Sequence, residues 1–183
     1  MKIPKIPIPQ VILDIFNKEG TTKKLKNKDH LVQEGEVPDQ CYLLERGVLR
    51  YYFCTEDGDE VTRVFIKQVD IPLAYRFFSE ELKPSGSFYS IQSLGQSTLK
   101  SVPWKSLESL IQRNHEAALF FLKKNEEIYF YRERSLRRST KMISENYREF
   151  LDDYSEILSN VNDRIIASYL NVSPESLSRI KKK

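Results

Sequence analysis

Short apolar runs alternate with polar turns between residues 21 and 110, at intervals of about 8 to 12 residues, which is typical of an all-β roll, barrel or sandwich. The clearest strands are CYLLERGVLRYYF, at residues 41–53, and EVTRVFIK, at residues 60–67, because both are rich in aromatic and β-branched residues. Between them Asp57-Gly58 predicts a hairpin, since glycine tolerates the positive φ of such a turn.

Glycines mark the other candidate strand junctions of this part. The segment SFYSIQSLGQSTLKSV, at residues 87–102, predicts two further strands that turn at Gly95. Gly35 and Gly47 lie at earlier junctions. The pattern therefore predicts a compact β-roll.

Helical periodicity replaces this pattern from about Ser106 onward, with no glycine or proline before Pro174. Apolar residues recur at every seventh position, at Leu122, Tyr129, Leu136, Ile143, Phe150 and Ile157. The positions three further along are polar, so a full coiled-coil seam is not specified. These apolar residues form one stripe along the helical region, and packing of a helix on its own domain explains part of this stripe. For residues 113–138 we predict helix-mediated homodimerisation.

A break in this helical region is expected between Arg138 and Ser144. Ser139 and Ser144 are both residue types that cap helix N-termini. After the break, ENYREFLDDYSEIL, at residues 145–158, places its apolar residues on one broad face. This helix is expected to begin a second, smaller core.

Two short helices with a sharp turn are predicted at the C-terminal end. Asn162 or Asp163 can cap the helix RIIASYL, which ends at Asn171, a residue type that tolerates the left-handed conformation. Ser173 caps the next helix, with Pro174 at its first position, where a fixed φ is favourable. The apolar residues have the pattern of a helix-turn-helix core. They are Ile166, Ala167, Leu170, Val172, Leu177 and Ile180.

The outer face of the last helix is polar and basic. It carries Glu175, Ser176, Ser178 and Arg179, followed by Lys181, Lys182 and Lys183. Arginine can pair with guanine, glutamate can accept from cytosine, and lysine neutralises phosphate. A plain helical hairpin with a polar outer face is the alternative, but the cap, turn, core and basic face together favour DNA binding.

The distribution of charge also points to the C-terminal end as the DNA-binding part. The chain has 183 residues and a net charge of +3. From Arg113 onward there are 14 Lys and Arg against 11 Asp and Glu, and four of the last five residues are basic. A solvated lysine tail would explain the charge by itself, so it gains meaning only from the helix-turn-helix beside it.

Several classes of protein do not fit this sequence. No apolar run reaches the roughly 18 residues of a membrane span, and the first ten residues, MKIPKIPIPQ, do not resemble a signal peptide. We therefore expect a cytoplasmic protein with no membrane partner. Cys41 and Cys54 are expected to be reduced, mostly buried thiols, with a disulfide as the lesser alternative.

Enzymatic activity is the weakest hypothesis. The two histidines, His30 and His115, lie far apart without an HxH pair, so neither a metal site nor a histidine base is indicated. The sequence contains no GxSxG, GxxxxGK[ST] or GxGxxG motif. We expect no enzyme, no catalytic residue and no bound metal.

With these elements the chain resembles the family of the cAMP receptor protein and the fumarate and nitrate regulator (Crp/Fnr). LVQEGEVPDQCYLLERGVLRYYF, at residues 31–53, resembles the first β-roll repeat of that family, and IASYLNVSPESLSRIKKK, at residues 166–183, resembles its helix-turn-helix. The expected fold class is α+β: an N-terminal β-roll (double-stranded jelly roll) similar to the cyclic nucleotide-binding domain, a long connecting helix, and a small helical domain. We assign residues 1–112 to the roll, 113–138 to the connecting and dimerisation helix, and 139–183 to the helix-turn-helix domain.

The resemblance implies roles for residues of the last helix. Glu175 and Arg179 match positions that contact bases, and Ser173 and Ser176 match positions that contact phosphates. Pro174 stands where the family has a base-contacting arginine, and the expected β-wing is missing from the sequence. We therefore expect binding to depend more on Lys181, Lys182 and Lys183 and to fall steeply with salt.

The ligand site of the family is altered here. Ser79-Glu80 stands in place of the Gly-Glu pair, and residues 87–90 stand where the phosphate-binding arginine is expected. Arg76 or Lys83 could replace that arginine. These departures argue against cAMP and leave open another effector, apolar or mixed in character, or a vestigial site. The candidate ligand residues are Arg76, Glu80, Ser87 and Tyr89.

The sequence thus predicts a homodimeric bacterial transcription regulator that binds palindromic DNA and in which the roll senses an effector. The resemblance adds RNA polymerase as a further expected partner. A ligand-binding or protein-interaction module whose helix-turn-helix-like tail does not bind DNA is the alternative.

Overall fold

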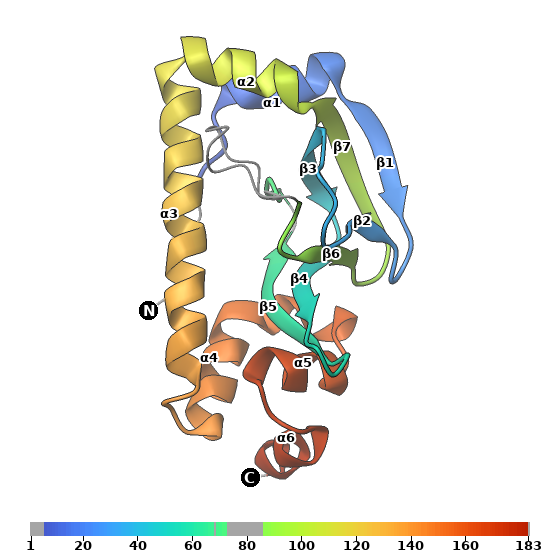
Figure 1. The fold of residues 1–183 in the computed structure, drawn as a ribbon, viewed down its shortest axis with the longest axis vertical. Helices are drawn as coiled ribbons and strands as arrows, with labels where there is room; N and C mark the ends of the chain where they lie inside the picture. Colours follow the sequence, from blue (N-terminus) through green and yellow to red (C-terminus); the bar gives the residue numbers. More distant parts are fainter. Residues whose placement is uncertain (1–5, 68, 73–85, 183) are drawn as a thin grey trace.

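The predicted β-roll is present as two facing antiparallel sheets (Figure 1). The computed structural model describes residues 6–67, 69–72 and 86–182. One sheet has the strand order β1-β7-β3 and the other β2-β6-β4-β5. The strands are β1 (Thr21–Leu25), β2 (His30–Val32), β3 (Gln40–Arg46), β4 (Val48–Cys54), β5 (Glu60–Lys67), β6 (Ser90–Ser93) and β7 (Ser97–Pro103).

Apolar side chains from both sheets fill the interior of the roll. Leu44, Leu49, Ile91 and Leu99 are fully buried there. Because side chains alternate along a strand, the neighbours of Leu49 on β4 point to the outer side of the sheet. The β4–β5 hairpin turns at Gly58, whose φ of 84° is the positive value expected from the sequence.

The part of the chain that the structure describes also contains seven helical segments. They are α1 (Gln10–Glu19), α2 (Trp104–Arg113), α3 (His115–Arg138), α4 (Ile143–Tyr154), the 3-10 helix η2 (Ser155–Asn160), α5 (Asp163–Leu170) and α6 (Pro174–Lys181). Helix α1 was not predicted. It buries Ile12 and Phe16, four residues apart on one face, against Trp104 and Leu107 of α2.

The long helical region is interrupted at Asn114. The side chain of Asn114 accepts a hydrogen bond from the Ala117 amide at 2.9 Å and thereby caps α3. Helix α3 then runs along the side of the roll to the C-terminal helices (Figure 1).

The expected serine caps of the next helix are wrong, although the break itself is confirmed. Helix α4 follows Met142, and no side chain caps it. Ser139 is the C-terminal cap of α3 and has helical φ and ψ of −66° and −18°, whereas an N-terminal cap is extended. Its hydroxyl donates to the Leu136 carbonyl. Ser144 lies inside the first turn of α4.

The apolar stripe with seven-residue spacing is buried in one part and exposed in another. Phe150 and Ile157 are buried in the core, as expected for a helix packed on its own domain. Leu122, Tyr129 and Leu136 on α3 are exposed, at 57%, 64% and 59%. The exposed row leaves homodimerisation through α3 as a prediction.

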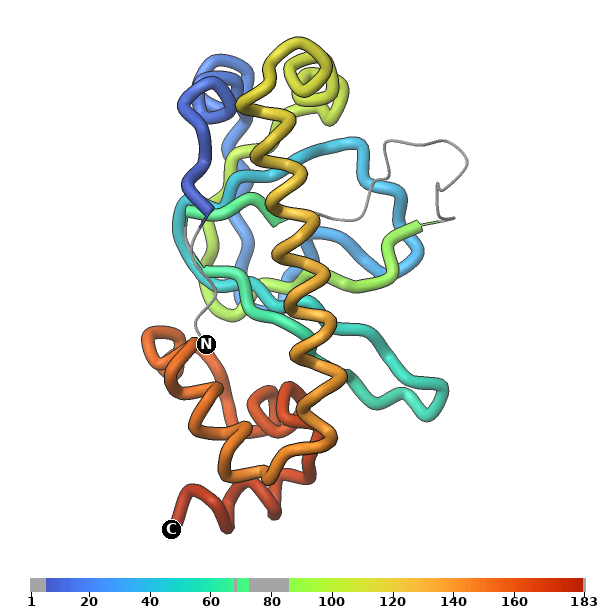
Figure 2. Tube along the Cα trace, turned by 90° about the vertical axis from the view of Figure 1, so that its left-hand side faces the viewer, coloured from blue at the N-terminus to red at the C-terminus, as the bar shows by residue number. Residues whose placement is uncertain are grey.

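One apolar cluster joins the roll to the C-terminal helices. Phe65 of β5 packs with Phe150, Tyr154 and Tyr169, with ring centroids 5.1 to 6.0 Å apart. Helix α5 contacts β5, and Figure 2 shows the C-terminal helices at the end of the roll toward which the β4–β5 hairpin extends. The division into three domains at residues 112 and 138 stays a prediction.

The cysteines differ from each other. Cys41 is buried as expected, whereas Cys54 is exposed, because β4 ends there at the projecting hairpin. None of the helices in the described ranges is long and apolar enough to cross a membrane.

Candidate nucleic-acid interface

Helices α5 and α6 form the predicted helix-turn-helix. Asn162 caps α5 by accepting from the Ile165 amide at 3.0 Å. At the other end Asn171 adopts the left-handed conformation, with φ 56° and ψ 48°, and the Val172 amide donates to the Ala167 carbonyl at 3.0 Å. The chain therefore turns from α5 into α6 within three residues.

Helix α6 begins as the sequence predicts. Ser173 accepts a hydrogen bond from the Ser176 amide at 3.2 Å, and Pro174 occupies the first helical position. Leu177 is fully buried and attaches α6 to the core shared with Phe150. This single apolar anchor turns the opposite face of α6 outward.

Polar residues occupy that outward face. Glu175, Ser178, Arg179 and Lys182 are exposed. Figure 1 shows α6 at the end of the molecule that is farthest from the roll. A helix of about two turns with an exposed cationic end fits into a major groove.

Electrostatic contacts adjust this face. A hydrogen bond from the backbone amide of Glu175 itself, with a second contribution from the Ser173 hydroxyl, lowers the pKa of the Glu175 carboxyl. Glu175 is therefore an acceptor at neutral pH. The ammonium of Lys181 forms an ion pair with Asp163 at the start of α5. Lys181 must leave that pair to reach a phosphate. Among the described residues no carboxylate pairs with Lys182, and Lys183 lies outside them.

Two of the four candidate ligand residues can be located. Ser87 is buried and its hydroxyl donates to the Tyr89 carbonyl at 2.6 Å, while the Tyr89 ring meets Tyr51 and Phe53 edge-on. The turn at Gly35-Glu36 bonds to both backbone groups of Ser87. Arg76, Lys83 and the Ser79-Glu80 pair lie outside the described residues.

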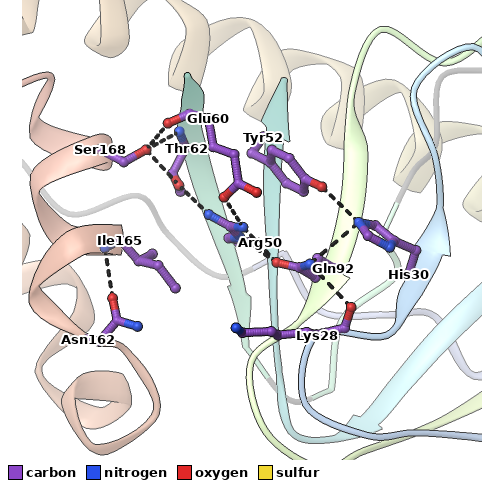
Figure 3. A network of polar contacts seen from close by, with 10 residues as sticks. All are labelled: Lys28, His30, Arg50, Tyr52, Glu60, Thr62, Gln92, Asn162, Ile165 and Ser168. Carbon is purple, nitrogen blue, oxygen red and sulfur yellow. Dashed lines mark hydrogen bonds and ion pairs between the residues drawn. The ribbon is translucent and has the colours of Figure 1, made fainter. Parts of the chain in front are cut away.

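A buried guanidinium that sequence reasoning missed lies between the roll and α5 (Figure 3). Arg50 is 3% exposed and donates to the Gln92 side chain, at 3.0 Å from Nε and 2.6 Å from Nη2. Nη2 also pairs with Glu60 at 2.5 Å. The sequence feature that could have revealed this site is the single arginine inside the otherwise apolar strand segment VLRYYF.

A cavity of about 800 Å³ lies beside the C-terminal half of β5. Phe65 and Lys67 of β5 line it together with Tyr131 of α3 and Glu156 of η2. It therefore touches the roll, the connecting helix and the C-terminal helices at once. Within the described ranges, no cluster of His, Cys, Asp and Glu side chains could hold a metal ion.

The comparison with known families agrees with this fold. The cyclic nucleotide-binding domain matches residues 22–114, which is slightly more than half of the chain. That match begins at the second residue of β1 and includes all the other strands and α2. No curated protein matches the chain.

Solved structures match over nearly the whole length. FixK2 from Bradyrhizobium japonicum is 19% identical with a TM-score of 0.75, and the match covers 89% of this chain and 83% of FixK2. CLP, a c-di-GMP responsive global regulator from Xanthomonas campestris, is 12% identical with a TM-score of 0.74, covering 95% and 90%. A proposed transcriptional regulator of the crp/fnr family from Eubacterium rectale is 14% identical with a TM-score of 0.73, covering 96% and 82%. At these identities the likeness establishes a shared fold.

Proposed function

We propose that this chain, which belongs to the cyclic nucleotide-binding domain family, is a homodimeric transcription regulator. It binds palindromic DNA through α6. The resemblance to Crp/Fnr regulators drawn from the sequence is confirmed at the level of family and fold. The observation that carries the proposal is the outward face of α6, which the Ser173 cap and the buried Leu177 hold away from the roll.

The roles of individual residues follow from this face. Arg179 and Glu175 project from α6 where base edges would lie, and Ser173 and Ser176 lie at its N-terminus, where backbone amides favour a phosphate. Lys181, Lys182 and Lys183 supply salt-dependent phosphate contacts.

Homodimerisation is supported by the exposed row on α3. Leu122, Tyr129 and Leu136 succeed each other at seven-residue intervals, which keeps them on one side of the helix. Large apolar side chains in such a row are typical of an interface rather than of a solvated surface. A two-fold dimer would present two copies of α6 to two half-sites.

The family implies that the roll can hold a small-molecule effector. We do not assign cAMP, because residues 87–90 read Ser-Phe-Tyr-Ser where a phosphate-binding arginine is expected. Ser87 and Tyr89 stay candidate ligand residues, as do Arg76 and Glu80. RNA polymerase likewise stays a proposed partner.

The proposal is tested by replacing Arg179. In a fluorescence anisotropy titration with a DNA duplex that the wild-type protein selects, Arg179→Ala is expected to weaken binding about 5- to 150-fold, as for the loss of a base contact of about 1–3 kcal/mol. Arg113→Ala removes an exposed arginine at the end of α2, far from α6, and is the matched control.

The alternative function gives a different result. If Arg179→Ala lowers the melting temperature without changing DNA affinity, the helix-turn-helix is a packing or interaction element and not a DNA reader. Unchanged melting with lost DNA affinity supports the regulator.

A further inference from the structure

Strand β5 lies at the edge of its sheet, and helix α5 lies against that edge (Figure 3). An edge strand presents backbone N–H and C=O groups that need hydrogen-bond partners. Ser168 of α5 supplies two of them. Its hydroxyl accepts from the Thr62 amide at 2.8 Å and donates to the Glu60 carbonyl at 2.6 Å.

These two hydrogen bonds join parts of the chain that are far apart in sequence. Thr62 belongs to the roll and Ser168 to the first helix of the helix-turn-helix, 106 residues later. One side-chain oxygen therefore connects the proposed sensor to the proposed DNA reader.

Arg50 supports the same contact from the roll side. Its Nη1 donates to the Thr62 hydroxyl at 3.3 Å, its Nη2 pairs with Glu60 at 2.5 Å, and its guanidinium lies over the Tyr52 ring at 4.2 Å. Gln92 accepts from Nε and from Nη2 of the same guanidinium. A buried guanidinium with this many partners has little freedom to move, so it fixes the two residues to which Ser168 binds.

The contact orients α6 without covering it. Helix α5 lies between the roll and α6, and the outward residues of α6 stay exposed (Figure 1). The direction of α6 therefore depends in part on how α5 packs on β5.

We propose that Ser168 is a positioning residue for DNA recognition, whose hydroxyl couples α5 to β5 and so fixes the separation of the two recognition helices in a dimer. This inference rests on the proposed function, because it requires that α6 reads DNA. Two half-sites lie about 34 Å apart, and a domain that can rotate on the roll loses orientational freedom when the second half-site is bound. If α5 is already held on β5, this loss of freedom does not occur on binding, and binding to both half-sites together is favoured.

The test compares two duplexes with the full-length protein. One is the palindromic duplex that wild-type protein selects from randomised DNA, and the other carries a single half-site. Ser168→Ala is expected to bind the palindrome about tenfold more weakly, as for a lost hydrogen-bond connection, and to bind the half-site as wild type does.

Matched variants separate positioning from a general loss of stability. Ser168→Thr keeps the hydroxyl and is expected to restore palindrome binding. Ser109→Ala removes an exposed helix serine that bonds within α2 and is expected to change neither affinity. If Ser168→Ala fails to fold, Arg50→Lys replaces it: this variant keeps a charge beside Glu60, loses the fork to Thr62 and Gln92, and is expected to show the same loss confined to the palindrome.

Each outcome has a definite meaning. Equal palindrome binding by wild type and Ser168→Ala overturns the inference and leaves the proposed function standing. Equal weakening on both duplexes also overturns it, because the serine would then act on α6 itself. If the wild-type protein shows no preference for any duplex, the proposed function fails and the inference with it.

Discussion

The two cysteines differ in reactivity for a reason visible at the scale of single residues. Burial raises the pKa of the Cys41 thiol to about 12, while Cys54 is exposed at the end of β4. The thiolate is the reactive form, so Cys41 is protonated at pH 8 and also inaccessible. We expect iodoacetamide to modify Cys54 alone in the folded protein, as measured by peptide mass spectrometry. Equal modification of both cysteines under native conditions would contradict the packing of β3 against α2.

Single residues were predicted well where their signal is local. The Asn162 cap, the left-handed Asn171 and the Ser173 cap with Pro174 each depend on neighbours within about four residues, so the sequence alone reveals them. Ser139 and Ser144 show the limit of this reasoning, because a residue type that can cap a helix caps only when its backbone is extended.

The contacts of Arg50 and Ser168 could not be predicted in this way. Arg50 meets Gln92 across the sheet, 42 residues away, and Ser168 meets Thr62 at a separation of 106 residues. Hydrogen bonds between such distant positions leave no periodic trace in a single sequence. The structure is needed to bring them together.

Helix α3 carries the prediction that belongs to the scale of elements. Replacing both Leu122 and Leu136 with glutamate places charge in the exposed apolar row, so we expect the dimer to dissociate into monomers. Analytical ultracentrifugation at micromolar concentration measures this change. The control is Lys123→Glu, which adds negative charge at an exposed position of α3 outside the row. Unchanged sedimentation of the double variant, or monomers already in the wild type, would exclude this helix as the interface.

Elements were predicted where periodicity is sustained. Strands β3 to β7 and the last two helices follow directly from their apolar patterns, as the structure confirms. Helix α1 was missed because the prolines before it suggested an irregular terminus, although Ile12 and Phe16 have helical spacing. The break at Asn114 was missed because neither glycine nor proline marks it.

At the scale of the whole molecule, the roll and the C-terminal helices share one aromatic core. Tyr154 and Tyr169 pack on Phe65, and burial raises the pKa of both phenols above the usual value of 10. The folded state thus favours the neutral phenols, and the unfolded state ionises first. This contribution to stability is complete below about pH 10 and is lost as pH rises further.

The shared core therefore predicts alkaline unfolding. We expect the free energy of unfolding, measured by urea titration between pH 8 and pH 11, to fall steeply above about pH 10. Tyr169→Phe is expected to lower stability at pH 8 and to make the fall shallower, because one ionising phenol is removed. The control is Tyr129→Phe, which removes an exposed phenol outside the shared core. A slope in Tyr169→Phe equal to that of wild type would show that this phenol is not held neutral by the core.

The proposed function requires two copies of α6 to bind one DNA duplex. The most direct measurement is selection of randomised duplex DNA by the wild-type protein at moderate salt, followed by sequencing. A dimer that reads DNA through α6 is expected to enrich a palindrome whose half-sites are centred about 10 base pairs apart, and Arg179→Ala is expected to lose or relax that motif. Recovery of no enriched motif, or of the same motif by Arg179→Ala, would contradict the assignment of α6 as the recognition helix.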